Sequence, residues 1–135
     1  MKNFANILAG CFFVLVLGVS KGTATDLDVV ICDAMKGMQL QEEKKIPYDI
    51  GDYKLIGITV DCNKKALITE KKHLEFMSSD FADDFKMEST RNWKNANCKN
   101  MIFNTDTGWS TTQIIKDIKE NLVLKLEANF KICSQ

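Results

Sequence analysis

The sequence has very few of the residues on which most enzyme sites depend. Its 135 residues include one histidine, His73, one proline, Pro47, and one arginine, Arg91. It contains no G-x-S-x-G, no Gly-rich phosphate loop and no H-E-x-x-H motif, which argues against the common hydrolase, nucleotide-binding and zinc-protease sites. His73 lies in the charged stretch TEKKHLE, where an imidazole buried and oriented by an acid is not expected. We therefore interpret His73 as a surface residue and expect no catalytic residues.

Neither sign of charge is in excess. The 18 basic and 18 acidic side chains give a formal net charge of zero. Without its first 24 residues, the chain loses Lys2 and Lys21 and no acid, so the balance becomes 16 − 18 = −2. Nucleic acids and anionic lipids are bound by clustered Lys and Arg side chains, so we expect neither as a partner.

A long apolar run occurs only near the N-terminus and is too short to span a membrane. It extends over about 13 residues from Ile7 to Val19, whereas a membrane-spanning helix needs about 20. Lys2 precedes this run and the small residues Gly22 to Ala24 follow it, which is the pattern of a secretory signal peptide. We expect residues 1–24 to be a signal peptide and residues 25–135 to form a single α+β domain.

The stretch ILAGC resembles a bacterial lipidation signal, in which Cys11 would be acylated and would anchor the chain. In that case the apolar segment before Cys11 would be only Phe4 to Leu8, and FFVLVLGV would remain on the mature protein. Both features argue against lipidation. We expect Cys11 to be removed with the leader, leaving no stable membrane anchor.

Four cysteines remain after the leader: Cys32, Cys62, Cys98 and Cys133. An even number in an exported protein indicates two disulfides. The gaps of 30, 36 and 35 residues do not suit zinc, which needs close ligand pairs, so no metal is expected. Three pairings are possible. We favour Cys32 with Cys62 and Cys98 with Cys133, because each pair would join a helical segment to the end of a strand, but spacing alone leaves the other two open.

The periodicity of apolar residues predicts a helix, a hairpin, a second helix and a second hairpin. Steps of three and four residues from Asp26 to Met38 indicate the first helix, and residues 79–96 indicate the second, with a short helical stretch at 101–102. The predicted strands are residues 53–62, 66–74, 109–118 and 122–133. In the first strand, alternation places Ile56, Ile58, Val60 and Cys62 on one face.

The last predicted strand is the clearest, because apolar residues from Leu122 to Ile132 alternate with largely polar ones. Such a strand exposes one face to water, so the helices are expected to lie on the other face. We therefore predict a two-layer α+β domain with a four-stranded antiparallel sheet, helices on one face, the order α-β-β-α-β-β and two disulfides.

Two groups of residues could carry a function. The acids Asp80, Asp83, Asp84 and Glu88 could suggest a cation site, but calcium loops need a turning backbone with a glycine, and a helix dipole already favours acids at a helix start. We interpret them as a solvated helix N-terminus and expect no cofactor. Tryptophans are enriched at interface hot spots, so Trp93 and Trp109 are the candidates for protein contact, although their positions favour core packing.

The residues Pro47, Asp49, Cys98, Gly108 and Cys133, with the stretches WKNANCKN and KIC, form a family-like pattern. In this pattern the segment from Pro47 to Cys133 resembles small exported bacterial proteins grouped as candidate quorum-sensing-regulated virulence factors and their uncharacterised relatives. The resemblance implies an exported α+β domain and a Cys98–Cys133 bridge, but no catalytic residues. The stretch IIKDIKENL lacks the family's tyrosine-rich strand and Asp-Gly or Asn-Gly turn, and Cys32 and Cys62 lie outside the pattern.

These features favour a non-enzymatic protein, secreted or periplasmic, that acts by protein–protein interaction as a secreted factor or as a binding or inhibitory module. Its protein partner is not identified by the sequence. The alternatives are an immunity or exclusion protein at the envelope and a small hydrolase that uses the carboxylates between Asp80 and Glu88.

The signal-peptide hypothesis predicts the mass of the exported protein. Intact mass spectrometry should give a chain that begins at Thr25 and lacks four hydrogens, because two disulfides have formed. A mass increased by a diacylglyceryl group would contradict this and would make Cys11 the anchor.

Overall fold

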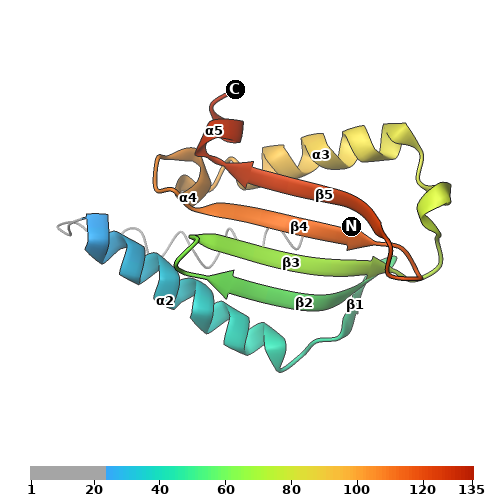
Figure 1. Cartoon of the computed structure of the whole chain (residues 1–135), viewed down its shortest axis with the longest axis horizontal. Coiled ribbons are helices and arrows are strands. Elements are labelled where there is room, and N and C mark those ends of the chain that lie inside the picture. Colours follow the sequence, from blue (N-terminus) through green and yellow to red (C-terminus); the bar gives the residue numbers. More distant parts are fainter. Residues whose placement is uncertain (1–23) are drawn as a thin grey trace.

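The computed structural model describes residues 24–135, so Cys11 and nearly all of the predicted leader lie outside the described residues. The described chain forms a five-stranded sheet with helices packed against it (Figure 1). In chain order, its elements are α2 (Ala24–Glu43), β1 (Tyr48–Ile50), β2 (Tyr53–Asp61), β3 (Ala66–His73), the 3-10 turn η1 (Ser78–Asp80), α3 (Asp83–Asn97), α4 (Met101–Asn104), β4 (Ser110–Lys116), β5 (Leu122–Asn129) and α5 (Phe130–Cys133).

The sheet is mixed, which corrects the predicted four-stranded antiparallel arrangement. The strands lie in the order β1-β2-β3-β4-β5, and β3 pairs with β4 in parallel while the other pairs are antiparallel. The parallel pair arises because α3 and α4 carry the chain back along the sheet before β4 begins. The additional strand, β1, has only three residues, too few to show an alternating pattern in the sequence.

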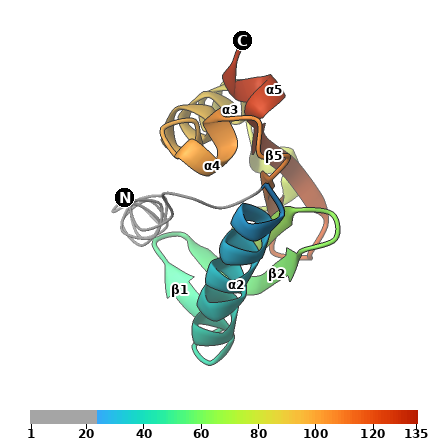
Figure 2. The ribbon, with the colours of Figure 1, turned by 90° about the vertical axis from the view of Figure 1, so that its left-hand side faces the viewer.

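The alternation of β3 divides the sheet into two faces. Leu67, Thr69, Lys71 and His73 lie on one side, which we call the covered face, and Ala66, Ile68, Glu70 and Lys72 lie on the other, the open face. Leu67 belongs to the same core cluster as residues of α2, and the His73 ring contacts Phe81, just before α3. Both helices therefore pack against the covered face, with α2 along β2 and α3 along β5 (Figures 1 and 2).

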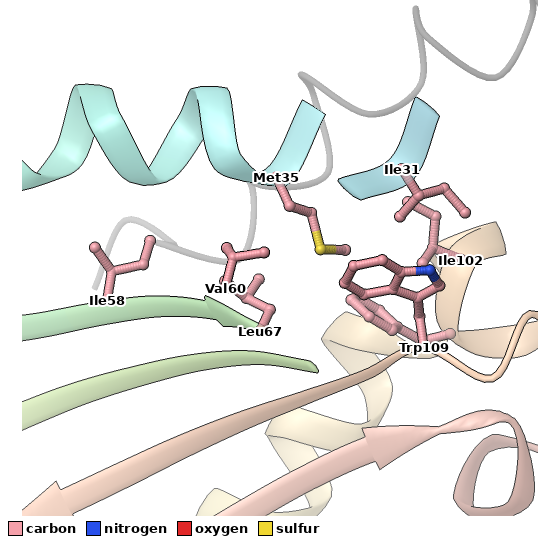
Figure 3. Close-up of a cluster of buried hydrophobic side chains, with 8 residues drawn as sticks. Ile31, Met35, Ile58, Val60, Leu67, Ile102 and Trp109 are labelled. Carbon is pink, nitrogen blue, oxygen red and sulfur yellow. The ribbon is translucent and has the colours of Figure 1, made fainter. Parts of the chain in front are cut away.

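The main core surrounds Trp109, which is 1% exposed (Figure 3). Its other buried members come from α2, from the first strands and from the short helix α4: Ile31, Met35, Ile58, Val60, Leu67, Ile102 and Phe103. Removing such side chains from water contributes roughly 1.5–3 kcal/mol each. Because four residues are too few for a stable isolated helix, α4 depends on the burial of Ile102 and Phe103 and on the cap from the Asn100 side chain.

A β-bulge in β2 changes which residues face the core. The register shifts between Leu55 and Gly57, so Ile56 is an extra residue in this strand. Leu55 is consequently buried, at 1% exposed, with Ile58 and Val60, whereas Ile56 is only partly buried. The predicted alternation placed Ile56 on the same face as Ile58 and Val60. It is therefore wrong for Ile56, at the bulge, and correct for Ile58 and Val60, which follow it.

The last strand is shorter than the predicted range of residues 122–133. It ends at Asn129, whose side-chain Oδ1 accepts a hydrogen bond from the backbone N–H of Ile132 at 2.9 Å and so caps α5. Phe130, predicted on the buried face, is 40% exposed.

Helix α2 also covers the outer edge of β2. The short strand β1 pairs only with residues 53–55, and beyond it the backbone N–H of Val60 donates to Oε1 of Gln39 at 2.8 Å. A side chain of the helix thus satisfies a donor at the free edge of the sheet.

Among the helices described from Ala24 onward, none has the length and apolar character needed to cross a bilayer.

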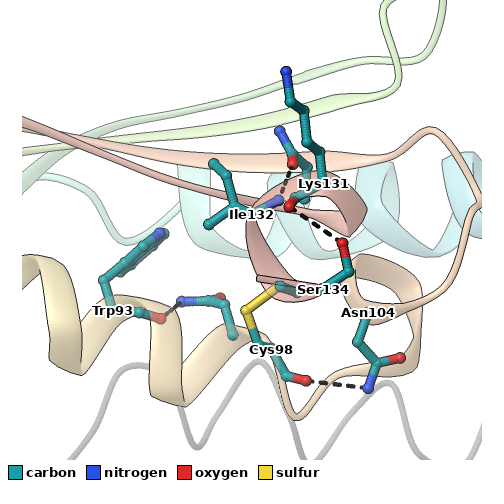
Figure 4. The surroundings of a disulfide bond; sticks show 9 residues. Trp93, Cys98, Asn104, Lys131, Ile132 and Ser134 are labelled. Atoms are coloured by element: carbon teal, nitrogen blue, oxygen red, sulfur yellow. Dashed lines mark hydrogen bonds between the residues drawn. A yellow bond between two sulfur atoms is a disulfide. The ribbon is translucent and has the colours of Figure 1, made fainter.

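Two disulfides are present, with the favoured pairing. Cys32–Cys62 joins α2 to the end of β2, and Cys98–Cys133 joins the end of α3 to α5 (Figure 4). Cys133 therefore lies in a short helix rather than in a strand. Both bridges lie at the end of the sheet where Asp61 pairs with Ala66 and Ser110 pairs with Asn129.

Reduction should destabilise the protein strongly. The bridges link residues 30 and 35 positions apart, and closing a loop of that size contributes about 3–4 kcal/mol each. Against a usual folding stability of about 5–15 kcal/mol, we expect dithiothreitol to lower the melting temperature by many degrees. Circular dichroism melts of the wild type and of the Cys32→Ala/Cys62→Ala and Cys98→Ala/Cys133→Ala variants would measure each contribution. An unchanged melt on reduction would contradict a stabilising role.

Candidate interaction surface

The acidic residues identified in the sequence form a helix start. Asp83 and Asp84 occupy the first turn of α3, where the helix dipole favours negative charge. The Asp83 side chain is 97% exposed and lies 4.0 Å from Lys86, and Asp80 Oδ2 accepts the backbone N–H of Met77 at 2.8 Å. Among residues 24–135 there is no group of three or more His, Cys, Asp or Glu that could hold a metal ion. The solvated helix start accounts for this cluster.

Neither tryptophan offers a fully exposed ring. Trp109 is buried in the core and Trp93 is partly buried on α3. The Nε1 atoms of both, and the hydroxyls of Thr69 and Thr111, are buried without a hydrogen-bond partner among the described residues. Such unsatisfied groups each cost about 1–3 kcal/mol, which well-packed apolar contacts must offset. The idea that Trp93 or Trp109 anchors a partner stays a prediction.

His73 is buried, contrary to the predicted surface position, and is only 5% exposed. The reason is the alternation of side chains along β3. His73 shares the covered face with Leu67 and Thr69, whereas its charged neighbours Glu70 and Lys72 lie on the open face. Its Nδ1 accepts two backbone hydrogen bonds, from Glu75 N–H at 3.0 Å and from Phe76 N–H at 2.9 Å. An unprotonated Nδ1 thus holds the first turn of the chain after β3.

Aromatic rings surround His73. The Phe76 ring stacks on the imidazole with centroids 4.4 Å apart and planes 6° from parallel. Tyr53 and Phe81 meet it edge-on at 4.9 and 5.4 Å, and Phe85 extends the cluster from Phe81 at 5.1 Å. Phe76 itself is 46% exposed, so it packs on His73 and still presents apolar surface to water.

Asp117, at the end of β4, is the second anchor of this region and is fully buried. Its Oδ1 accepts the backbone N–H groups of Lys119 and Asn121, both at 2.8 Å. Its Oδ2 accepts Asn121 Nδ2 and the N–H of Ser78, both at 3.0 Å. Burial alone would raise the pKa of Asp117, but the hydrogen bonds from Asn121, Ser78 and Lys119 outweigh it and lower the pKa to about 2.

These anchors bring three exposed apolar side chains to the same end of the sheet. Phe76, Ile118 and Leu122 are 46%, 40% and 62% exposed, and we call them the apolar end. The N–H of Ile118 donates to the carbonyl of Phe76 at 2.9 Å, and Leu122 follows Asn121 in the turn that Asp117 holds. This turn and the chain leaving β3 lie at the right of Figure 1. This set is not recognisable in the sequence because Phe76 lies far along the chain from Ile118 and Leu122, although aspartate is a common turn residue whose side chain accepts the backbone N–H two residues later, as Asp117 does from Lys119.

A cation lies beside the apolar end. Lys71 Nζ is 4.2 Å from the centroid of the Tyr53 ring, on the covered face two residues before His73. Burial lowers the pKa of Lys71 to about 8. The ion pairs of the described residues give Lys71 no carboxylate partner, so the tyrosine ring is its counterpart.

The Asp117 turn predicts a specific acid dependence. A carboxyl group whose pKa is lower in the folded state than in the unfolded state stabilises the protein above the unfolded value of about 3.9, and this contribution is lost as the pH falls towards 2. Asp117→Asn should therefore be less stable than the wild type at pH 5, and the difference should narrow at pH 2.5. Urea unfolding of both proteins at the two pH values measures it. A constant difference would mean that the charge of Asp117 is unimportant.

Comparison with known proteins finds likeness at the level of structure. No family model and no curated protein matches the sequence. A candidate secreted protein of Pseudomonas aeruginosa aligns at 14% identity over 84% of this chain and 99% of its own, with a TM-score of 0.59. The type II secretion system pilotin AspS of Vibrio cholerae aligns at 10% identity over 83% of this chain and 100% of its own, with a TM-score of 0.57. The pilotin EpsS of the Vibrio vulnificus type 2 secretion system aligns at 11% identity over 82% and 94%, with a TM-score of 0.50. These likenesses establish a shared fold, and none of them supports a link to quorum sensing or virulence.

Proposed function

We propose that this protein is exported, into the periplasm or the medium, and that it acts there by binding another protein. Two disulfides are expected of a small domain in an oxidising compartment. A candidate secreted protein and two pilotins share its fold over more than four fifths of each chain. A signal peptide at residues 1–24 and a domain at residues 25–135 are part of the same proposal.

The apolar end is the observation that carries this proposal. Its three side chains project from backbone that is pinned by two anchors, His73 and Asp117. A rigid apolar surface loses little conformational entropy on binding, which favours affinity. Single exposed apolar residues are ordinary on protein surfaces, so the significance lies in three of them around one fixed turn.

The hydrogen bonds of His73 and Asp117 disfavour a catalytic role for either side chain. The acceptor nitrogen of His73 is occupied by two backbone donors, and both oxygens of Asp117 accept two hydrogen bonds each. Neither group is free to take a proton from a substrate in this arrangement. The candidate chemistry of this region is therefore apolar contact.

The first class of partner to test is an envelope component of a protein secretion system. Two of the fold neighbours are pilotins of type II secretion systems, and the proposal extends that context to this chain. Trp93, partly buried on α3, is a further candidate contact residue that can be probed in the same way.

Site-specific photo-crosslinking tests the proposal. We expect benzoylphenylalanine at Phe76 or Leu122 to give one defined adduct in the producing cells, identified by mass spectrometry as an exported or envelope protein. Leu40 on α2 is a matched control, because it is as exposed as Leu122, at 61% against 62%, and lies outside the apolar end. Phe76→Ser should reduce the adduct formed from position 122 several-fold.

Two results would contradict the proposal. The first is a crosslinking pattern that is the same from Leu40 as from the apolar end, which would indicate non-specific contact. The second is the absence of any adduct from positions 76, 122 and 93 across growth conditions.

A further inference from the structure

The two disulfides close loops of similar size, so loop length does not distinguish them. Cys32–Cys62 links residues 30 positions apart, and Cys98–Cys133 links residues 35 positions apart. What distinguishes them is how firmly the folded chain holds the two thiols together when the bond is open, because thiols held close together re-form their bond readily.

Cys32 stays in place without its bond. It lies within the 20-residue helix α2, whose neighbouring side chains Ile31 and Met35 are 4% and 0% exposed in the main core. One turn before the cysteine, Oδ2 of Asp28 lies 2.8 Å from Nζ of Lys65 and ties the helix to the turn after β2. These contacts keep the helix against the sheet when the sulfur is free.

Cys62 is held in the same way by the turn between β2 and β3. Asp61, just before it, pairs with Ala66 at the end of the two strands. The carbonyl of Cys62 accepts the N–H of Lys65 at 3.3 Å, and Oδ1 of Asp61 accepts the N–H of Lys64 at 3.0 Å. The first bridge therefore joins two positions that the fold already holds close together.

In the second bridge only one cysteine is held in this way. Cys98 follows α3, and its N–H donates to the carbonyl of Lys94 at 2.9 Å. Its own carbonyl accepts Nδ2 of Asn104 at 3.1 Å (Figure 4). Its partner, Cys133, is the last residue of α5, which has four residues and no buried one. A helix of this length is not stable by itself.

The bridge is the strongest link between α5 and the rest of the protein. The capping hydrogen bonds of α5 stay within the segment: Oδ1 of Asn129 accepts the N–H of Ile132 at 2.9 Å, and the N–H of Ser134 donates to the carbonyl of Phe130 at 3.0 Å. Its apolar contacts are partial, since Phe130 is 40% exposed and Ile132 and Cys133 are only partly buried. Opening the bond leaves this segment with little to hold it beside α3.

We propose that Cys98–Cys133 is a redox modification site: a dithiol opens it selectively and releases residues 130–135, while Cys32–Cys62 stays closed and the domain stays folded. The co-reactant is a protein dithiol of the C-x-x-C class, whose chemistry is thiol–disulfide exchange. The site and the apolar end lie at opposite ends of the sheet, so this inference does not depend on the proposed binding role.

The exchange transfers two electrons from the dithiol to the bridge. A thiolate of the dithiol attacks one sulfur of the bridge, which breaks the S–S bond, forms a mixed disulfide and releases the other cysteine as a thiolate. The second thiol of the dithiol loses its proton and attacks the mixed disulfide, so the dithiol becomes a disulfide and the remaining cysteine is released. The two protons lost by the dithiol are balanced by the two that the protein thiolates take up.

Graded reduction of the folded, disulfide-intact protein tests the proposal. The protein is equilibrated at pH 7.5 with mixtures of reduced and oxidised dithiothreitol, free thiols are trapped with N-ethylmaleimide, and peptide mass spectrometry identifies the cysteines that have reacted. We expect Cys98–Cys133 to be half open at a reduced-to-oxidised ratio about tenfold or more below that of Cys32–Cys62. Between the two midpoints, circular dichroism should still show a cooperative melt.

Amide hydrogen exchange at such an intermediate ratio reports the release itself. The amides of Ile132 and Ser134 should lose protection, because their acceptors lie within the detached segment. The amide of Val60 is an internal control, since its acceptor, Oε1 of Gln39, lies on α2 and remains in place.

Two matched variants test whether the hold on α5 sets the order of reduction. Asn129→Ala removes the cap of α5 and should lower the ratio that opens Cys98–Cys133 a few-fold, without moving that of Cys32–Cys62. Gln39→Ala removes a hydrogen bond of α2 instead and should leave the opening of Cys98–Cys133 unchanged. If a variant fails to fold, the wild-type reduction series still decides the question.

Three results would overturn the proposal: opening of Cys32–Cys62 at the same or a lower ratio, an Ile132 amide that stays protected after Cys98–Cys133 has opened, or loss of the cooperative melt as the first bond opens. None of these measurements involves a binding partner. Failure of photo-crosslinking from the apolar end would therefore refute the proposed function without touching this site, and simultaneous reduction would refute this site alone.

Discussion

The arrangement of this protein depends on the alternation of β3. This strand lies in the middle of the sheet, and every second side chain, from Leu67 to His73, points to the covered face. Leu67 belongs to the core cluster that includes residues of α2, and the His73 ring contacts Phe81 just before α3. A shift of one residue would turn Glu70 and Lys72 towards the covered face and would move Leu67 and His73 to the open face.

The two ends of the sheet are held together by different interactions. At one end, where Ala66 pairs with Ser110, two disulfides tie α2 and α3 to the sheet around a core centred on Trp109. At the other end, the described chain has no disulfide, and the connections are made by the hydrogen bonds of His73 and Asp117. One end is therefore held by covalent bonds and the other by hydrogen bonds to two buried side chains.

Burying polar side chains at the apolar end costs free energy, and their hydrogen bonds offset that cost. Burying a carboxylate is unfavourable unless hydrogen bonds replace water, and Asp117 accepts four of them. These hydrogen bonds outweigh the effect of burial, so the pKa of Asp117 lies below its ordinary value. The turn therefore holds Ile118 and Leu122 in a fixed geometry, so a partner that binds them loses little conformational entropy in ordering this backbone.

The sequence by itself determined the local features whose signals lie within a few residues. These include the two amphipathic helices, the acids at the start of α3 and the strand at β4. The sequence favoured the observed disulfide pairing without excluding the other two. Only the tertiary structure decided the parallel pairing of β3 with β4, the bulge at Ile56 and the burial of His73, because each depends on which strand lies beside which. The apolar end belongs to the second group, since Phe76 and Ile118 are brought together by a crossover whose direction no local periodicity encodes.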